Sequence, residues 1–221
     1  MIFVIQCAGD KRHGAGSLTR GDGSPVMFVA KPAEMPDHHH PEYVYAHPDD
    51  ISEYGESWRR RLLDYNESPG SNPLGLLPAW QLYRNPAYSR LVETYGPGRV
   101  YVLSAGWGLI NSEFLTPPYD VTFSAKRGTG IRRDASTDFR DLCLIPEECS
   151  EPIVFFGGKS YLPLFRELTR PFDCRKIVFY NSSNPPHTPG CELRRFRTEL
   201  RTNWHYQCAQ QFMNGAIDAG L

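Results

Sequence analysis

The chain has 221 residues, of which 40% are hydrophobic and 22% charged, and its formal net charge is −1. This length suits one large domain with a sizeable core, and the composition excludes a chain that is disordered throughout. Affinity for nucleic acid depends on many phosphate contacts. A nearly neutral chain therefore argues against a general nucleic-acid coat protein, although it leaves room for a local basic patch.

The six cysteines show no Cys-x-x-Cys spacing, and no charged-then-apolar signal segment precedes them. We therefore expect free thiols in a reducing compartment. No apolar run approaches the roughly 20 residues that a membrane span needs. The sequence thus predicts a cytoplasmic protein with no membrane partner, and it leaves the oligomeric state open.

Four short, almost continuously apolar runs predict buried strands, namely Ile2–Gln6, Arg99–Ser104, Ile153–Phe156 and Lys176–Tyr180. Strands that are apolar on both sides are typical of a parallel sheet covered on both faces. Val26–Ala30 is a candidate for one more strand. Strands that alternate with helices favour right-handed βαβ units. We therefore predict an α/β fold, a single layered domain over residues 1–221 with a mostly parallel central sheet flanked by helices.

Helical spacing of apolar residues predicts helices over Glu53–Tyr65, Pro78–Tyr95, Ser160–Thr169 and, as one or two helices, Glu192 to about Gly215. Pro86 is expected to break or kink the second of these. Residues 8–50 and 124–134 are rich in glycine, proline or basic residues and are predicted to be irregular loops. Loops of this length serve as binding segments or are disordered.

The strongest signal for a ligand site follows the strand that ends at Ser104. The segment Ser104-Ala-Gly-Trp107-Gly108 brings a hydroxyl, backbone N–H groups and a flat aromatic side chain to one place, and Tyr119-Asp120 follows closely. Glycine lets a ligand approach the backbone, and a tryptophan there could stack on a nucleobase. The alternative is that Trp107 fills the core and the glycines serve only the turn.

The loop after the first predicted strand carries three candidate reacting groups. Asp10 could act as a general base or an electrostatic stabiliser, and Lys11 could neutralise a phosphate. Cys7 could be a nucleophile if a neighbouring cation lowered its pKa. The alternative is that Cys7 belongs to the core.

Two further strand-end loops are polar. Residues 157–161, Gly-Gly-Lys-Ser-Tyr, place glycines and a lysine before a predicted helix, which favours an anion cradle, although this is not a Walker motif. Asn181 and Ser182 follow the last predicted strand and could grip a base edge or a phosphate, but the same residues are common in ordinary turns. Ligands in open α/β sheets bind beyond the carboxyl ends of the strands. The convergence of four such loops therefore predicts a pocket.

No metal and no cofactor is predicted. His38, His39 and His40 with His47 could ligate zinc, but no carboxylate–histidine spacing completes such a site. His205, within a predicted helix, is interpreted as a packed and hydrogen-bonded residue of the core.

Together these landmarks resemble a family of bacterial domains related to the peroxide-stress protein YaaA. The resemblance is carried by Cys7 with Lys11, Ala79-x-x-Leu82-Tyr83, Leu103-Ser104-Ala105-x-x-Gly108-Leu109, Pro118-Tyr119-Asp120 and Gly157-Gly158-Lys159-x-Tyr161. It covers the landmarks of about half the chain, and residues 12–75 and the tail after 185 fall outside it. Family patterns often have Lys-Tyr where this chain has Gly106-Trp107, so no role of that lysine carries over.

This resemblance implies nucleobase or nucleic-acid chemistry. YaaA-like proteins are associated with DNA binding, and the Cys…Lys and Gly-Leu…Pro-Tyr-Asp pattern is more distantly similar to the core domain of archaeosine synthase, which modifies a deazaguanine base in tRNA. The layout of polar strand-end loops is also similar to that of uracil-DNA glycosylases. By that analogy Asp10 or Asp120 would orient water or stabilise an oxocarbenium-like sugar, and Trp107 or Tyr119 would stack on an extruded base.

The leading hypothesis is an enzyme, such as an N-glycosylase, that acts on a base in DNA, RNA or a nucleotide. The candidate catalytic residues are Asp10, Asp120 and Cys7. The candidate binding residues are Lys11, Tyr83, Ser104, Trp107, Gly108, Tyr119, Gly157, Gly158, Lys159, Tyr161, Asn181 and Ser182. The alternatives are a non-catalytic protein that senses a nucleotide or damaged DNA, and an interaction module with an exposed apolar patch in place of a pocket.

Overall fold

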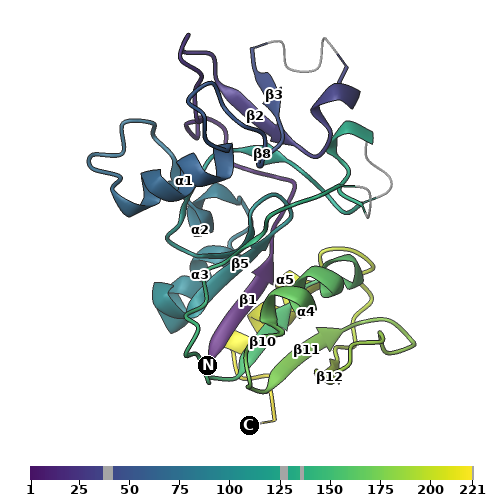
Figure 1. Ribbon diagram of the computed structural model, residues 1–221. Helices are drawn as coiled ribbons and strands as arrows, with labels where there is room; N and C mark the ends of the chain where they lie inside the picture. The colour runs from purple at the N-terminus through teal and green to yellow at the C-terminus, as the bar shows by residue number, and fades with distance from the viewer. Residues whose placement is uncertain (37–41, 125–128, 135–136, 221) are drawn as a thin grey trace.

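A central sheet organises the computed structural model, which describes residues 1–36, 42–124, 129–134 and 137–220 (Figure 1). Within these residues the sheet has seven strands in the order β12 (Glu192–Arg195), β11 (Lys176–Tyr180), β10 (Ile153–Phe156), β1 (Ile2–Gln6), β5 (Val100–Ser104), β6 (Gly108–Asn111) and β9 (Leu142–Cys143). All neighbouring strands are parallel except β5 and β6, which pair antiparallel. The predicted α/β fold with a mostly parallel sheet is confirmed.

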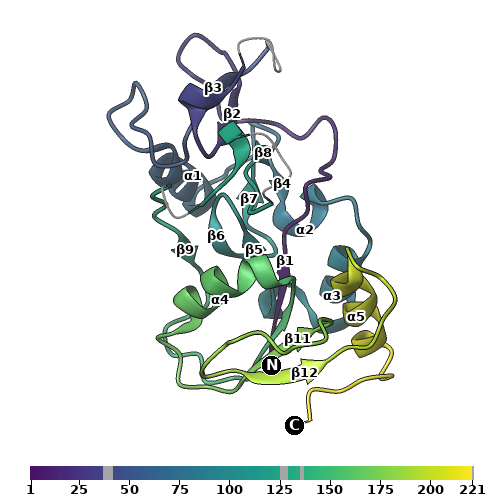
Figure 2. The ribbon, with the colours of Figure 1, turned by 90° about the vertical axis from the view of Figure 1, so that its right-hand side faces the viewer.

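The apolar runs of the sequence become the central strands because helices cover both faces of the sheet. Neighbouring side chains of a strand point to opposite faces, and β10 shows the result. The ring of Phe155 stacks on Phe165 of α4 (Leu162–Thr169), with centroids 4.5 Å apart. The ring of Phe156 meets Phe212 of α5 (Trp204–Met213) at 5.5 Å. Figure 2 shows α4 on one side of the sheet and α5 on the other, beside α3 (Ala87–Tyr95).

One helix prediction needs correction at its start, and one predicted helix break is confirmed. The first helix, α1, spans Trp58–Glu67 rather than 53–65, because the Ser57 hydroxyl accepts a hydrogen bond from the backbone N–H of Arg60 and so caps the helix. The expected break at Pro86 is confirmed, since this residue separates α2 (Ala79–Leu82) from α3. None of the described helices is long and apolar enough to cross a membrane.

The prediction that residues from Glu192 onward are helical is wrong for the first part of that segment. Glu192–Arg195 forms the edge strand β12, and only Trp204–Met213 is helical. Arginine, glutamate and leucine favour a helix locally. The free edge of β11 offers backbone hydrogen bonds that override this preference, because the register pairs Ile177 with Glu192 and Tyr180 with Arg195.

A smaller parallel sheet lies beyond the carboxyl ends of the main strands, at the top of Figure 1. It consists of β3 (Val44–Ala46), β2 (Val26–Val29) and β8 (Tyr119–Asp120), and a short antiparallel pair joins β4 (Leu77–Pro78) to β7 (Leu115–Thr116). The expected strand near residue 26 is confirmed, and residues 8–50 are less irregular than predicted. Residues 38–40 of the histidine run, and part of the 124–134 loop, lie outside the described residues.

The turn between β5 and β6 requires glycine at position 108. Gly108 has φ +93°, and a Cβ there would overlap the backbone of Leu142 in β9. We expect Gly108→Ala to lower the free energy of unfolding by about 2–4 kcal/mol, from backbone strain and overpacking together, as measured by urea denaturation. The matched change Gly98→Ala has open space around it and an ordinary φ, so it should be close to neutral. Equal effects of the two changes would contradict this account.

Candidate functional site

The strand order reverses between β1 and β10. The chain passes from β1 to β5 on one side, whereas β10 leads to β11 on the other. In open α/β sheets, ligands bind outside the carboxyl ends of the strands at such a reversal. A cleft of about 760 Å³ opens at this place. Its lining consists of Gln6, Cys7, Ala8, Gly9, Asp10, Arg84, Asn85, Thr122, Ser124, Gly158, Ser160, Tyr161, Arg201, Thr202, Asn203, Trp204, His205 and Tyr206. We call it the switch-point cleft.

Hydrogen bonds fix the backbone at the floor of this cleft. The side-chain oxygen of Gln6 accepts a hydrogen bond from the backbone N–H of Gly158 at 2.6 Å, which joins the ends of β1 and β10. The Tyr88 hydroxyl donates to the carbonyl oxygen of Gln6 at 2.7 Å and lies 3.2 Å from the Tyr206 hydroxyl. Four elements that are far apart in the sequence, β1, α3, β10 and α5, are thereby held together at the floor of the cleft.

Five of the predicted site residues meet in a buried polar cluster beside the cleft. The Cys7 sulfur lies 3.2 Å from the Tyr161 hydroxyl. The Tyr119 hydroxyl accepts a hydrogen bond from Ser104 at 2.8 Å and lies 2.8 Å from the Tyr83 hydroxyl. All five residues are buried. The sequence landmarks thus converge in space, although most of their polar atoms bind one another.

Burial, and secondarily the nearby Cys7, raises the pKa of Tyr83, Tyr119 and Tyr161 well above the ordinary tyrosine value. These phenols therefore stay neutral at neutral pH and serve as hydrogen-bond donors and acceptors rather than as bases. The polar contacts of Cys7 are also neutral, namely the Tyr161 hydroxyl and the backbone N–H of Ala105 at 3.4 Å. A nucleophilic cysteine needs a neighbouring cation, and these contacts supply none.

A second, smaller cleft of about 370 Å³ lies between the loop after β1 and the small sheet. Lys11, Tyr119 and Asp120 belong to its lining. The Lys11 Nζ is 4.1 Å from the centroid of the Tyr119 ring, a cation–π contact. Asp10 lines both clefts, and its exposed carboxylate is 3.6 Å from the Arg84 guanidinium. Asp10 is therefore the predicted acid–base residue that reaches either space.

Several predicted binding residues are not in the clefts. Trp107 has no exposed surface and packs edge-on against Phe28 at 4.9 Å, so it fills the core and is not available to stack on a base. Gly108 serves the turn described above. Lys159, Asn181 and Ser182 are absent from the linings of both clefts. The β11 loop is separated because β11 lies two strands away from β1.

The Gly157-Gly158 turn does not form the open anion cradle that the sequence predicts. The backbone N–H of Gly158 already donates to Gln6. A Cβ at Gly157 would overlap the ring of Phe155. The two glycines therefore allow close packing and the joining of strand ends, and Gly158 alone of the pair lines the switch-point cleft.

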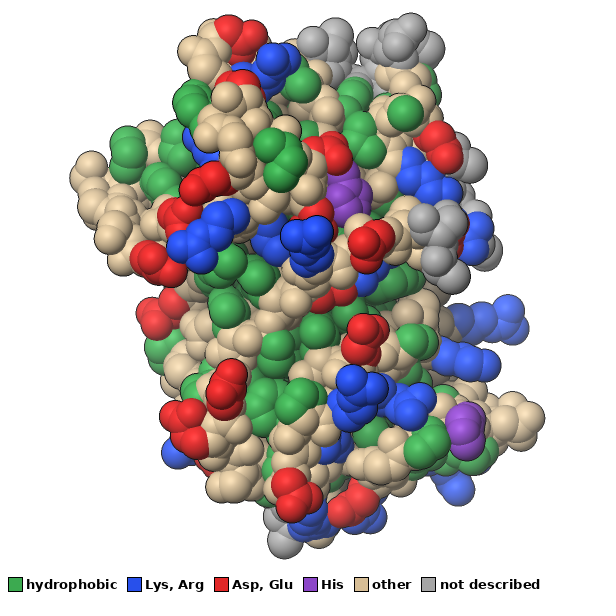
Figure 3. Space-filling view, in the orientation of Figure 1, with side chains coloured by type: hydrophobic (Ala, Val, Ile, Leu, Met, Phe, Trp, Pro, Cys, Tyr) green, Lys and Arg blue, Asp and Glu red, His purple; other side chains and the backbone are tan. Residues whose placement is uncertain are grey.

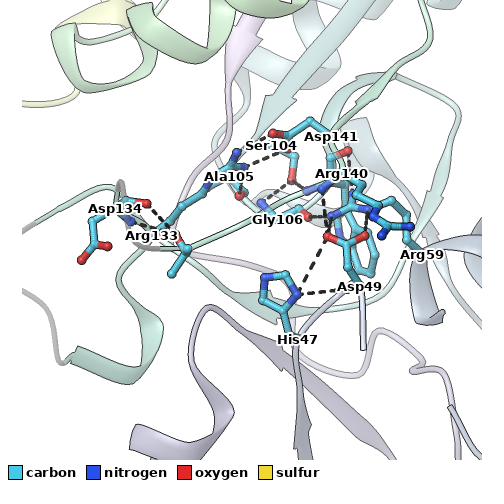
Figure 4. A network of polar contacts seen from close by, with 12 residues as sticks. His47, Asp49, Arg59, Ser104, Ala105, Gly106, Arg133, Asp134, Arg140 and Asp141 are labelled. Carbon is cyan, nitrogen blue, oxygen red and sulfur yellow. Dashed lines mark hydrogen bonds and ion pairs between the residues drawn. The ribbon is translucent and has the colours of Figure 1, made fainter. Parts of the chain in front are cut away.

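Two arginines, the buried Arg59 and the half-buried Arg133, which the sequence analysis did not identify, hold the loop after β5 (Figure 4). Arg59 forms a two-point ion pair with Asp49 at 2.6 and 3.0 Å, and it also donates to the carbonyl oxygens of Gly106 and Trp107, both at 3.1 Å. The carboxylate of Asp49 accepts a further hydrogen bond from the backbone N–H of Arg140 at 3.0 Å. Both carboxylate oxygens of Asp49 thus accept hydrogen bonds from fixed donors.

The second arginine is Arg133, which pairs with Asp141 and donates to the carbonyl oxygen of Ala105 at 2.9 Å. On the other side of the loop, the backbone N–H groups of Gly106 and Trp107 donate to the Ser104 hydroxyl at 3.2 and 3.1 Å. These bonds fix the loop beside the buried polar cluster, whose tyrosines we call the tyrosine cluster. The backbone N–H groups of Gly106 and Trp107 are already bonded to Ser104 and are not open to a ligand.

Within the described residues, no group of three or more His, Cys, Asp or Glu side chains could hold a metal ion. Comparisons with protein-family models, with curated proteins and with solved structures give no match to this chain. What the fold and the site define is a class: an α/β protein with a polar cleft at the switch point of a mostly parallel sheet.

Proposed function

We propose that this protein binds a nucleotide, free or within a nucleic-acid strand, in the switch-point cleft and acts on its base. The observation that carries the proposal is the cleft itself. It lies where α/β sheets bind ligands, its volume falls in the range of about 300–1,000 Å³ typical of ligand pockets, and its lining combines amide, hydroxyl and guanidinium groups. These groups suit a ligand that has both base edges and negative charge.

The surface favours a local site over a long tract of nucleic acid. Basic and acidic side chains are interspersed on the face shown in Figure 3, and the net charge is −1. Strong binding of an extended strand needs many phosphate contacts. The proposed ligand is therefore a single nucleotide or a few nucleotides of a strand.

The proposed reaction is hydrolysis of the N-glycosidic bond. A water molecule attacks the anomeric carbon, the bond from that carbon to the base breaks, and the base leaves with the electron pair and takes up a proton. Asp10 receives the proton of the attacking water, because it is the aspartate at the rim that both clefts share. The YaaA-like resemblance, carried by Cys7, Lys11, Tyr119 and their neighbours, supports base chemistry of this kind.

A non-catalytic nucleotide sensor is the second candidate. It is favoured by the hydrogen bonds that occupy the tyrosine cluster, because these leave few reacting groups in the cleft. Assay of base release by chromatography separates the two candidates, since a sensor binds the nucleotide without releasing its base.

Blocking the cleft tests the site. A ligand at 100 times its Kd should stabilise the fold by about 2.7 kcal/mol, which is several degrees of Tm for a chain of this size. We expect such a shift with nucleoside monophosphates or short oligonucleotides. It should disappear in Ser160→Trp, which fills the cleft from an exposed lining position, and persist in Ser183→Trp, which is exposed elsewhere. A shift that survives Ser160→Trp places the ligand outside this cleft.

A further inference from the structure

The N-terminus of helix α5 opens into the switch-point cleft. Its first residues, Trp204, His205 and Tyr206, and the preceding Asn203, all belong to the lining. The first backbone N–H groups of a helix have no acceptor within the helix, and a side chain usually caps them. Asn203 takes a left-handed conformation with φ 59° and makes no such cap. The backbone N–H of Tyr206 donates to the carbonyl oxygen of Asn203 at 3.2 Å, whereas the N–H groups of Trp204 and His205 receive no cap from the Asn203 side chain.

A second, independent feature of the same wall also lacks a partner. His205 is only 2% exposed, and its Nε2 makes no hydrogen bond with any residue that the structure describes. Burial lowers the pKa of His205 to about 3, so the imidazole is neutral at pH 7. A buried polar atom without a partner costs about 1–3 kcal/mol. His205 belongs to the lining of the cleft, so a ligand oxygen that reaches Nε2 would remove this cost.

Positive charge is placed at the same end of the cleft. Arg201 is exposed, lines the cleft and forms no ion pair with the described residues. Arg84 lines it as well and is paired with Asp10. The charged residues of the lining are Arg201, Arg84 and Asp10, so the net charge of the lining is +1. Helix N-termini attract anions through both their N–H groups and the helix dipole.

We propose that the N-terminus of α5, with His205 Nε2 and Arg201, binds the phosphate group of the nucleotide. The imidazole donates from Nε2 to one phosphate oxygen, the helix N–H groups donate to others, and Arg201 supplies the balancing charge. This inference rests on the proposed function, because it assigns one part of the same cleft to one part of the ligand. It deepens that proposal by naming the residues that recognise the phosphate group of the nucleotide.

Calorimetric titration of the whole protein tests this assignment. The probes are the four 2′-deoxynucleoside 5′-monophosphates, the matching nucleosides, inorganic phosphate and short oligonucleotides with and without a 5′-phosphate. We expect the preferred monophosphate to bind about 10- to 100-fold more tightly than its nucleoside, which corresponds to one or two charge-assisted hydrogen bonds. The paired oligonucleotides show whether a terminal or an internal phosphate occupies the subsite.

Two variants with one matched control sharpen the test. Arg201→Gln should weaken the monophosphate about tenfold or more and leave nucleoside affinity unchanged. Arg197→Gln, exposed in the same segment but outside the cleft, should change neither. His205→Phe should raise the Tm of the unliganded protein, because it removes an unpartnered buried nitrogen, while it weakens phosphate binding. A histidine with a purely structural role would not give these two effects together.

The outcomes separate the two proposals. Equal affinity for monophosphate and nucleoside overturns the phosphate subsite and leaves nucleobase binding in place. Inorganic phosphate that binds as tightly as every monophosphate, with loss in Arg201→Gln, supports the subsite and contradicts nucleobase recognition. Equal losses in Arg201→Gln and Arg197→Gln mean that the attraction is general and overturn the assignment to α5.

Discussion

Replacing Arg59 by methionine is expected to lower the free energy of unfolding by about 3–5 kcal/mol, because it leaves the Asp49 carboxylate largely buried without its partner. Arg59 is 4% exposed and makes four hydrogen bonds, two of them to the loop after β5. Lysine cannot replace its two-point geometry. Chemical denaturation monitored by tryptophan fluorescence measures the effect.

The neighbouring residue provides the control. Arg60 lies on the same helix, is exposed, and pairs with Asp64 at 2.6 Å. Exposed pairs of this kind contribute about 0–1 kcal/mol, so Arg60→Met should be nearly neutral. The double variant Arg59→Met with Asp49→Leu should recover part of the loss, since no unpaired charge remains. The account of the Arg59 pair is wrong if Arg59→Met and Arg60→Met cost the same.

The same pair predicts a dependence of stability on pH. Burial alone raises the pKa of Asp49, but the hydrogen bonds and charge of Arg59 outweigh burial and hold this pKa below the ordinary aspartate value. A carboxyl group with a lowered pKa in the folded state stabilises the fold above its unfolded pKa, near 4, and the stabilisation is lost as the pH falls through the folded value. The double variant should therefore lose less stability than the wild type on acidification below pH 4.

Much of the fold could be predicted because the central strands are uninterrupted apolar runs in the sequence. The run Ile153–Phe156 is apolar at every position, and only a strand covered on both faces needs that pattern. The edge strand at Glu192–Arg195 could not be predicted in this way. Its side chains are polar and its pairing depends on the free edge of β11, which no local pattern reveals.

The site residues also differ in whether local sequence patterns could predict their positions. Cys7, Asp10 and Gly158, which follow β1 and β10, line one cleft, and the sequence could predict this because parallel strands end on the same edge of a sheet. Arg59 could not be told from Arg60 in the sequence, since the helical face that each occupies depends on where α1 begins. The α5 wall of the cleft was missed because the return of the chain from β12 to the β1 end is a tertiary feature.

Replacing Asp10 by asparagine is expected to lower the rate of base release by about 10²–10⁴-fold, the usual contribution of general acid–base catalysis. Asparagine keeps the size of the side chain and a hydrogen-bond acceptor toward Arg84, but it cannot take a proton from water. The Asp10 side chain is 69% exposed, so the variant should fold as the wild type does. Loss of its negative charge leaves Arg84 and Arg201 in the lining, so binding of a phosphorylated ligand should not weaken. Initial rates under saturating substrate, with Kd measured in parallel, separate loss of chemistry from loss of binding.

Asp120→Asn is the informative comparison, because Asp120 lines the second cleft but not the switch-point cleft. If base release depends on Asp10 alone, the reacting bond lies toward the switch-point cleft, where β1 and β10 end. Dependence on Asp120 alone would move the chemistry to the side of Lys11 and Tyr119. If base release depends on both aspartates, the sugar lies beside Asp10, where the two clefts meet. The phosphate then lies at the N-terminus of α5 and the base between Lys11 and the small sheet. Unchanged rates in both variants contradict the catalytic role of these aspartates, and ligand binding without base release would then identify a nucleotide sensor.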